Sequence, residues 1–232
     1  MIYITGDTHS DFERFERFCE ENKTTADDIM IILGDVGLNY FNDQRDKELK
    51  EKAAGFPLTF FCIHGNHEMR PADVGTYVTK EFHGGTVWYE EEFPSLLFAR
   101  DGDVFNFDGH ECLVIGGAYS IDKYWRLLRG WKWFANEQPD NVIKARVEER
   151  LARRGDKVDV VLSHTCPVCY EPVDVFFKDI DQSMVDKSTE MWLGMVEFRL
   201  NYKKWYCGHY HISRARGKMR FMYEEIEPFS AQ

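Results

Sequence analysis

Short apolar runs alternate with charged stretches over the first part of the chain. Runs rich in Ile and Phe occupy residues 2–6, 29–33 and 58–63. Each run is too short for a typical helix and ends at or just before Gly or a polar residue, which is the pattern of a buried β-strand. The charged stretches between the runs predict helices at about 11–22 and 43–54. This part of the chain therefore has the predicted order β-α-β-α-β.

Residues 86–117 interrupt this alternation with short strand-like runs that are separated by Gly, Asp and Pro. Such runs suggest antiparallel neighbours in a sheet. They are Thr86–Tyr89, Leu96–Ala99, Val104–Phe107 and Cys112–Ile115. The rest of the chain predicts two helices, at about 140–154 and 188–201, and four strands, at 158–162, 203–207, 212–216 and 219–225.

Metal-liganding residue types follow five of the predicted strands. In α/β sheets ligands bind outside the carboxyl ends of the strands, so residues that are far apart in the sequence can meet there. Side chains at i and i+2 of an extended chain project the same way, so Asp7 and His9 can direct two ligands into one site. The five stretches supply donors for two adjacent metal ions, in two Asp, one Asn and four His: Asp7, His9, Asp35, Asn66, His164, His209 and His211.

Glycine stands shortly before ligand types at four of these strand ends. A chain that leaves a strand must turn sharply there, and other residues would be strained. Asn66-His67-Glu68 also suits the start of a following helix, since Asn is a favoured N-cap residue and Glu suits a first helical turn. The four glycines are Gly6, Gly34, Gly65 and Gly208.

The order of the motifs, Asp-x-His, Gly-Asp, Gly-Asn-His-Glu, a lone His and Gly-His-x-His, resembles that of the calcineurin-like metallophosphoesterases. The match runs from residue 7 to residue 211. The resemblance implies an α/β (α+β) fold in which two mixed β-sheets are sandwiched between helical layers, in the four-layer αββα arrangement. Residues 1–232 are long enough for one substantial core and are expected to form a single domain.

The resemblance also implies a role for each matching residue. His67 is similar to the family's catalytic histidine beside the metals. The implied ligands form two sets that share one bridging carboxylate: Asp7, His9 and His211 for one ion, Asn66, His164 and His209 for the other, and Asp35 between them.

Such a centre suits an anionic phosphate-ester substrate. The formal charge of two divalent cations exceeds that of Asp7, Asp35 and a bridging hydroxide by one, because the other ligands are neutral. We therefore expect a hydrolase in which metal-activated hydroxide attacks phosphorus in line and His67 assists the departure of the alcohol. The resemblance favours Mn²⁺ or Fe, although Zn²⁺, Co²⁺ or Ni²⁺ also suits these ligand types.

The loop after the Gly-Asp motif departs from the pattern of one branch of this family. Members that act on phosphoserine and phosphothreonine typically carry Gly-Asp-x-Val-Asp-Arg-Gly, in which the second Asp orients the catalytic histidine and the Arg binds phosphate. This chain has Gly34-Asp35-Val-Gly-Leu-Asn39 instead. The absence of both residues argues against protein-phosphatase activity, although Asn66-His67-Glu68 resembles that branch. Arg70 or a cation of residues 117–137 is a candidate to replace the missing guanidinium. The choice between monoester and diester, the natural substrate and the group that orients His67 stay open.

Residues 117–137 combine aromatic and basic side chains directly after a predicted strand. In one interpretation this insert is a lid, whose cations grip phosphate while an aromatic ring packs on the rest of the substrate. In a second interpretation the aromatic residues are core and the basic residues are solvated, and in a third the insert is a docking surface for another subunit. The candidate substrate-binding residues are Tyr119, Lys123, Arg126 and Arg129.

Charge and hydropathy exclude other classes of partner. The net charge of −11 disfavours a general affinity for nucleic acid, which depends on clustered Lys and Arg. No apolar stretch approaches the ~18 residues that span a membrane, and the first apolar run lacks the basic leader of a secretory signal. We therefore expect a cytoplasmic protein with no membrane partner. The oligomeric state stays open.

Two alternatives belong to other functional classes. One is a non-catalytic binding or scaffold module on the same fold, which the full ligand set disfavours. The other is a redox or structural-zinc protein centred on Cys166 and Cys169, but a lone Cys-x-x-Cys beside Pro167 is better explained as loop thiols. Cys62 and Cys207 lie within apolar strands and are expected in the core.

Overall fold

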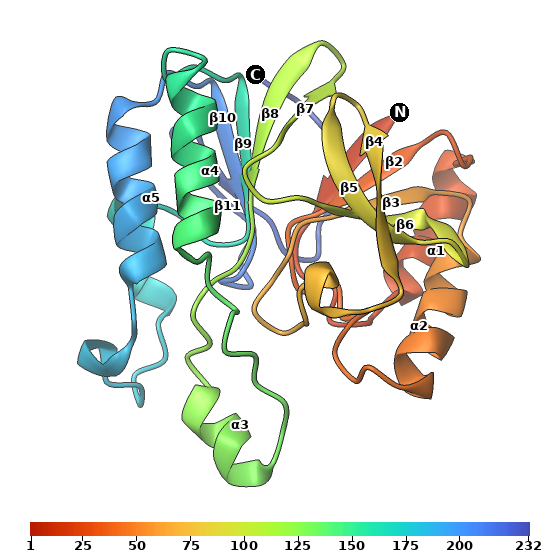
Figure 1. Cartoon of the computed structure of the whole chain (residues 1–232), viewed down its shortest axis with the longest axis horizontal. Helices are drawn as coiled ribbons and strands as arrows, with labels where there is room; N and C mark the ends of the chain where they lie inside the picture. Colours follow the sequence, from red (N-terminus) through yellow and green to blue (C-terminus); the bar gives the residue numbers. More distant parts are fainter.

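The computed structural model describes every residue of the chain, 1–232, and contains two β-sheets (Figure 1). The first sheet contains β1 (Ile2–Thr5), β2 (Ile29–Ile32), β3 (Thr59–Cys62), β4 (Tyr77–Phe82), β5 (Gly85–Glu90), β6 (Phe93–Ala99) and β13 (Glu227–Pro228). Its strand order is β13-β1-β2-β3-β6-β5-β4. The second sheet contains β7 (Val104–Phe107), β8 (His110–Ile115), β9 (Val160–Ser163), β10 (Lys204–Cys207), β11 (Arg214–Arg216) and β12 (Met219–Phe221). Its order is β11-β12-β10-β9-β8-β7.

Helices cover the outer faces of both sheets. Helices α1 (Glu13–Asn22) and α2 (Gln44–Ala54) lie against the first sheet, and α4 (Asn141–Ala152) and α5 (Ser188–Arg199) lie against the second (Figure 1). Helix α3 (Lys123–Arg129) projects from this body. The expected αββα sandwich of two mixed sheets is confirmed. No helix is both long and apolar enough to cross a membrane.

The helices begin and end where the sequence favours it. Asp43 caps α2 by accepting a hydrogen bond from the backbone N–H of Arg45 at 2.9 Å. Asp140 caps α4 in the same way, accepting from the N–H of Ile143 at 2.8 Å. Such caps satisfy backbone donors that have no partner inside the helix.

Three apolar layers hold the four structural layers together. Alternate side chains of a strand face opposite sides of its sheet, so β1 directs Ile2 and Ile4 between the sheets and Tyr3 toward the helices. The central layer contains Phe61 and Leu162, one from each sheet. The outer layers lie between each sheet and its helices. Strands buried on both faces explain why the sequence shows continuous apolar runs rather than alternation.

The strands that precede the candidate ligands run parallel. In the first sheet β1, β2 and β3 are parallel neighbours, and in the second sheet β8, β9 and β10 are parallel neighbours. Their carboxyl ends therefore share one edge within each sheet. Backbone hydrogen bonds join the loops at this edge, from His9 N–H to the Asp35 carbonyl at 2.8 Å and from Gly208 N–H to the His164 carbonyl at 2.9 Å.

Several elements differ from the sequence-based expectations. Strand β4 was not predicted, because it lies at the edge of its sheet and most of its side chains are exposed or half-buried, so it lacks an apolar run. Helix α3 lies inside the expected insert. The last predicted strand, 219–225, is confined to β12. No α-helix follows Glu68, since only the single 3₁₀ turn Pro71–Asp73 occurs before β4.

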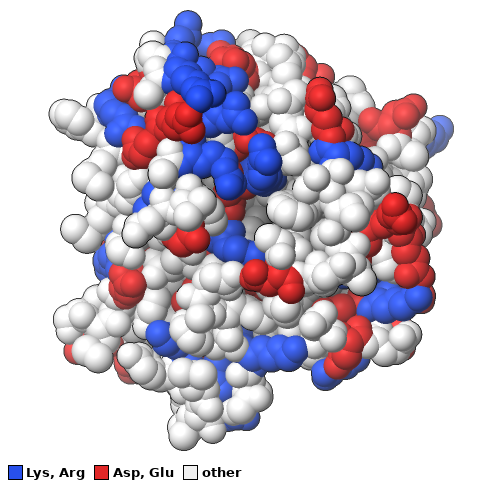
Figure 2. Space-filling view, in the orientation of Figure 1, with Lys and Arg blue, Asp and Glu red and all other residues white.

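The surface seen in the orientation of Figure 1 carries acidic and basic side chains interspersed (Figure 2). This face has no continuous basic stripe of the kind that tracks a nucleic-acid backbone. The lack of such a stripe on this face agrees with the net negative charge of the chain.

Candidate metal centre

The seven candidate ligands meet where the two sheets adjoin. The loops after β1, β2 and β3 bring in residues from the first sheet, and the loops after β9 and β10 bring in residues from the second. Three overlapping groups of residues could each hold a metal ion, because within each group the ligand atoms lie within 4.8 Å of one another. The groups are Asp7, His9 and His211; His9, Asp35 and His67; and Asp7, Asp35 and His164. None of these groups contains a cysteine.

Asp35 lies between the other donors. Its Oδ2 atom is 3.6 Å from His164 Nε2 and 3.9 Å from the Nε2 atoms of His9 and His67. Its Oδ1 atom accepts a hydrogen bond from the His67 backbone N–H at 2.8 Å. Burial alone would raise the pKa of Asp35, but the surrounding imidazoles, led by His164, lower that pKa overall. This carboxylate therefore lies at the position where the bridging ligand was expected.

Asp7, His9 and His211 form one side of the centre. The Nε2 atoms of His9 and His211 are 2.9 Å apart, and His211 Nε2 is 3.8 Å from Asp7 Oδ1. Both carboxylate oxygens of Asp7 accept a hydrogen bond from the backbone N–H of His209, at 3.1 and 3.0 Å. These three residues are the set that the resemblance assigns to one ion.

Asn66 and His164 are oriented by hydrogen bonds away from the centre. His164 Nδ1 lies 2.8 Å from the carbonyl oxygen of Leu33, so Nδ1 donates to this carbonyl and Nε2 faces Asp35 Oδ2 at 3.6 Å. The amide nitrogen of Asn66 donates to Ser120 Oγ at 2.9 Å, which turns its Oδ1 toward His164 Nε2 at 2.8 Å. Ser120 Oγ in turn donates to Glu137. Outer partners of this kind hold metal ligands in place.

The protonation of the centre also suits metal binding. Burial lowers the pKa of His9 to about 4 and holds that of His209 well below its ordinary value, so both rings are neutral and can offer a lone pair. Burial, together with the nearby carboxylate of Asp35, raises the pKa of Asp7 to about 7. Asp7 and Asp35 are buried close together, and a pair of divalent ions would supply the positive charge that balances two carboxylates. The donor set therefore fits the expected dinuclear centre.

The backbone adopts the left-handed region at four candidate ligands. The φ angles are 46° at His9, 48° at Asp35, 66° at His209 and 51° at His211. Non-glycine residues seldom adopt such angles, and they gather at functional sites where the surrounding structure enforces them. The loops are thus held in a costly conformation that points donor atoms inward.

The glycines beside the ligands are required mainly by close approach. A Cβ atom on Gly65 would lie 1.9 Å from Asp35 Oδ1, and one on Gly208 would lie 2.5 Å from Asp7 Oδ2. Gly34 combines such a contact, 2.1 Å from His164 Nδ1, with a φ of 98°. The expected sharp turn therefore accounts for Gly34, whereas Gly65 and Gly208 leave room for a carboxylate.

His67 lies beside the metal ligands and contacts an arginine from α3. Arg126 Nη2 is 3.2 Å from His67 Nε2 and also contacts His67 Nδ1. Asp122 holds the guanidinium through an ion pair of 2.8 Å with Arg126 Nε. The insert therefore brings the Arg126 cation and the Asp122 carboxylate close to the His67 ring. The sequence alone did not identify a group that orients this ring.

The remaining substrate-binding candidates divide into two sets. Tyr119 lines a cavity that opens beside the centre. Lys123 lies over the Trp133 ring, 4.1 Å from its centroid, and Arg129 lies over the Trp125 ring at 4.5 Å. Arg70 forms a 2.5 Å ion pair with Asp101 and donates to the Asn136 carbonyl at 2.8 Å. Neither Lys123, Arg129 nor Arg70 lines this cavity.

Glu68 has a role that sequence reasoning missed. Its expected place in a helical first turn is wrong, because no α-helix follows it. Its carboxylate instead accepts hydrogen bonds from Gly65 N–H at 3.0 Å and Gly37 N–H at 3.1 Å. The side chain is fully buried, and burial raises its pKa to about 8. Glu68 thus ties the loop after β2 to the loop after β3. The only sequence signal was its place directly after Asn66-His67.

The thiols lie outside the centre. Cys166 is buried, Cys169 is exposed, and neither forms a disulfide. Cys62 and Cys207 are fully buried, as expected for core positions. The cysteines therefore give no support to a second metal site.

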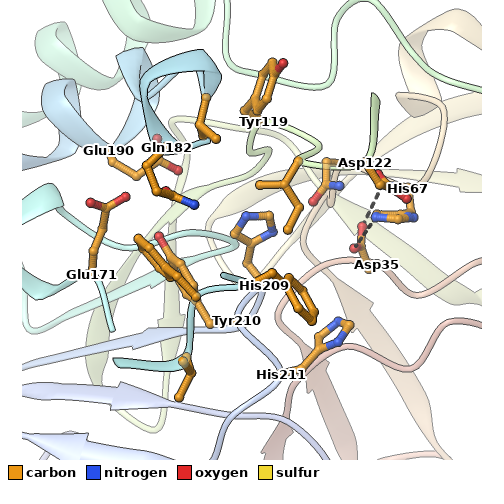
Figure 3. Close-up of a pocket in the computed structure, with 16 residues that line it drawn as sticks. Asp35, His67, Tyr119, Asp122, Glu171, Gln182, Glu190, His209, Tyr210 and His211 are labelled. Atoms are coloured by element: carbon orange, nitrogen blue, oxygen red, sulfur yellow. Dashed lines mark hydrogen bonds and ion pairs between the residues drawn. The ribbon is translucent and has the colours of Figure 1, made fainter. Parts of the chain in front are cut away.

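A cavity of about 400 Å³ opens beside the centre (Figure 3). Asp35, His67 and His211 lie on one side of it, and Glu171, Gln182 and Glu190 lie on the other. The cavity therefore adjoins the candidate ligands Asp35 and His211.

The sandwich and its convergent Asp, Asn and His donors define an α/β protein with a candidate metal site at the carboxyl ends of its strands. A family model described as calcineurin-like phosphoesterase matches residues 1–213. The chain belongs to the calcineurin-like phosphoesterase family, whose members act on phosphoesters and bind a dinuclear metal centre. The resemblance inferred from the motifs is confirmed.

Comparisons with individual proteins add little to this. No curated protein matches the chain. The crystal structure of TT1561 of Thermus thermophilus has 14% sequence identity and a TM-score of 0.49, with 100% of this chain and 98% of that chain covered. The phosphopantetheinyl hydrolase PptH from Mycobacterium tuberculosis has 15% identity and a TM-score of 0.42, with 96% and 87% covered.

Proposed function

We propose that this protein hydrolyses phosphate esters at a dinuclear centre formed by the seven ligands. The observation that carries the proposal is the position of Asp35, whose Oδ2 atom faces the imidazoles of His9, His67 and His164 at 3.6–3.9 Å. When bound, two divalent ions would acidify a shared water, polarise the phosphoryl oxygens and stabilise the leaving oxygen. The two ligand sets are Asp7, His9 and His211, and Asn66, His164 and His209, with Asp35 between them.

His67 is assigned the task of assisting the leaving group. It lies on the cavity wall beside Asp35, so a substrate at the centre would present its ester oxygen within reach of the ring (Figure 3). Arg126 limits the motion of this ring and adds positive charge at the same place, while Asp122 positions the guanidinium. Arg126 thereby takes the place of the arginine that the motif after Asp35 lacks, and residues 117–137 act as a lid on a single domain.

Metal-dependent cleavage of simple esters tests the proposal. Protein stripped with a chelator should not cleave p-nitrophenyl phosphate or bis(p-nitrophenyl) phosphate, and adding Mn²⁺ or Fe²⁺ should restore cleavage of at least one of them. Release of p-nitrophenol measures the rate, and the two esters compare the monoester and diester classes. No cleavage with Mn²⁺, Fe²⁺, Zn²⁺, Co²⁺ or Ni²⁺ would leave a binding module as the better explanation.

Replacement of His67 by Ala should impair the departure of poor leaving groups. We expect turnover of a phenyl ester to fall by about 10²–10⁴-fold, because a positioned acid contributes this much. A p-nitrophenyl ester should lose less, because its leaving group needs less protonation. Metal content measured by mass spectrometry should stay unchanged, and His83→Ala, an exposed histidine in the β4–β5 turn, is the matched control. Equal losses on both esters would remove His67 from this role.

A further inference from the structure

The cavity beside the centre is larger than a phosphoryl group requires. Its volume of about 400 Å³ corresponds to the liquid volume of roughly a dozen waters. It lies within the range that encloses small organic ligands. The cavity therefore has room for a second part of a phosphate-ester substrate.

One wall of the cavity is apolar and aromatic. Val175, Phe176, Phe177 and Val185 line it from the segment that links β9 to α5. This segment contains only short 3₁₀ turns, and long irregular loops in compact domains are often binding loops. The Phe176 ring stacks on Tyr210, with centroids 6.3 Å apart and planes at 13°. A flat ring would pack against such a surface.

The far end of the cavity carries hydrogen-bond acceptors. Glu190 is 4% exposed, and its Oε1 atom accepts from Thr165 Oγ1 at 2.8 Å, while its Oε2 atom has no partner. A buried polar atom without a partner is unfavourable, so a donor from a bound molecule would satisfy it. Glu171 and Gln182 lie on the same side, opposite Asp35 and His67 (Figure 3).

The charges at this end favour donors over anions. Lys187 balances Glu171 through an ion pair of 2.9 Å and lies over the Phe176 ring. None of the residues that line the cavity is Lys or Arg. A second phosphate or carboxylate on the substrate would therefore meet Glu171 and Glu190 and no lining cation, whereas N–H groups would find acceptors.

We propose that the cavity binds the organic part of a phosphate ester as a planar ring with N–H donors at its far edge, as in a nucleotide. The aromatic wall packs on the face of the ring, and Glu190 and Gln182 accept from its edge. This assignment of substrate class rests on the proposed function, since the phosphoryl group must lie at the metal centre. The ring-binding cavity would then be the feature that selects one phosphate ester over another.

Matched esters that differ only in the ring test this proposal. For diesters the pair is guanosine 5′-(p-nitrophenyl phosphate) and methyl p-nitrophenyl phosphate; for monoesters it is guanosine 5′-monophosphate and methyl phosphate. In the class that the protein cleaves, kcat/KM should be at least about 10-fold higher for the guanosine compound. Equal values would overturn the substrate class but leave the hydrolase intact. Failure to cleave any p-nitrophenyl ester would overturn the proposed function instead.

Binding of free guanosine to the Mn²⁺-loaded protein gives a readout that does not depend on catalysis, because guanosine has no phosphate ester to cleave. Calorimetry should show binding that Phe177→Ala and Glu190→Gln each weaken at least about 5-fold, because the first removes ring contact and the second replaces an acceptor by an N–H donor. Phe198→Ala, an exposed phenylalanine further along α5, is the matched control and should bind like the wild type. Unaltered binding in Phe177→Ala, or no binding to the wild type, would overturn the proposal.

Discussion

Replacing Asp35 by Asn is expected to lower kcat/KM for p-nitrophenyl esters by at least about 10³-fold. The amide keeps the shape of the carboxylate but removes the charge that would hold two cations together. Loss of several kcal/mol of electrostatic stabilisation corresponds to this factor, since each 1.36 kcal/mol changes a rate tenfold. Steady-state kinetics with saturating Mn²⁺ measure the effect, and metal analysis should show fewer ions bound per chain.

The matched control is Asp27→Asn. Asp27 is exposed and precedes β2, so it lies at the opposite end of the strand that leads to Asp35. Its replacement should leave kcat/KM and metal content unchanged. Activity within a few fold of wild type in Asp35→Asn would contradict the bridging role and with it the proposed mechanism.

Gly65→Ala is expected to lower both activity and stability by more than the small size of the added methyl group suggests. The added Cβ atom would lie 1.9 Å from Asp35 Oδ1, so the carboxylate or the loop after β3 must move. A displacement of about 1 Å at a catalytic group can cost 10²-fold in rate, and overpacking of a tight interior typically costs about 1–3 kcal/mol of stability. We therefore expect kcat/KM to fall at least about 10²-fold and the midpoint of thermal unfolding to decrease.

Gly75→Ala provides the comparison for this substitution. Nothing lies within 4 Å of a Cβ atom built at Gly75, and its backbone is not in the left-handed region. The alanine should therefore be tolerated, with activity close to that of the wild type. Equal activity of the two variants would show that the loop after β3 yields easily and that Asp35 is not held against it.

The strands and the ligand types could be predicted because they depend on local pattern. Runs such as 29–33 are apolar on every residue since their strands are buried on both faces, and Asp35 follows the run after a single glycine, Gly34. Parallel pairing then places such residues at one edge of the sheet. The family's motif order supplied the rest of the ligand set.

Contacts between distant segments could not be predicted in this way. Glu68 bonds Gly37, and Arg126 contacts His67, but neither partner is marked by spacing or periodicity. The left-handed backbone at His211 is likewise imposed by its surroundings, because non-glycine residues seldom adopt it unless the fold enforces it. The polar edge strand β4 was not predicted, because its stability comes from pairing with β5 rather than from burial.

The centre draws its donors from both halves of the sandwich, with Asp7 and Asp35 from one sheet and His164 and His209 from the other. Ions bound there would connect two separate β-sheets. A ligand that binds only the folded state stabilises it in proportion to the logarithm of its free concentration. The supply of divalent metal would then govern how much of this protein stays folded as well as how fast each folded molecule works.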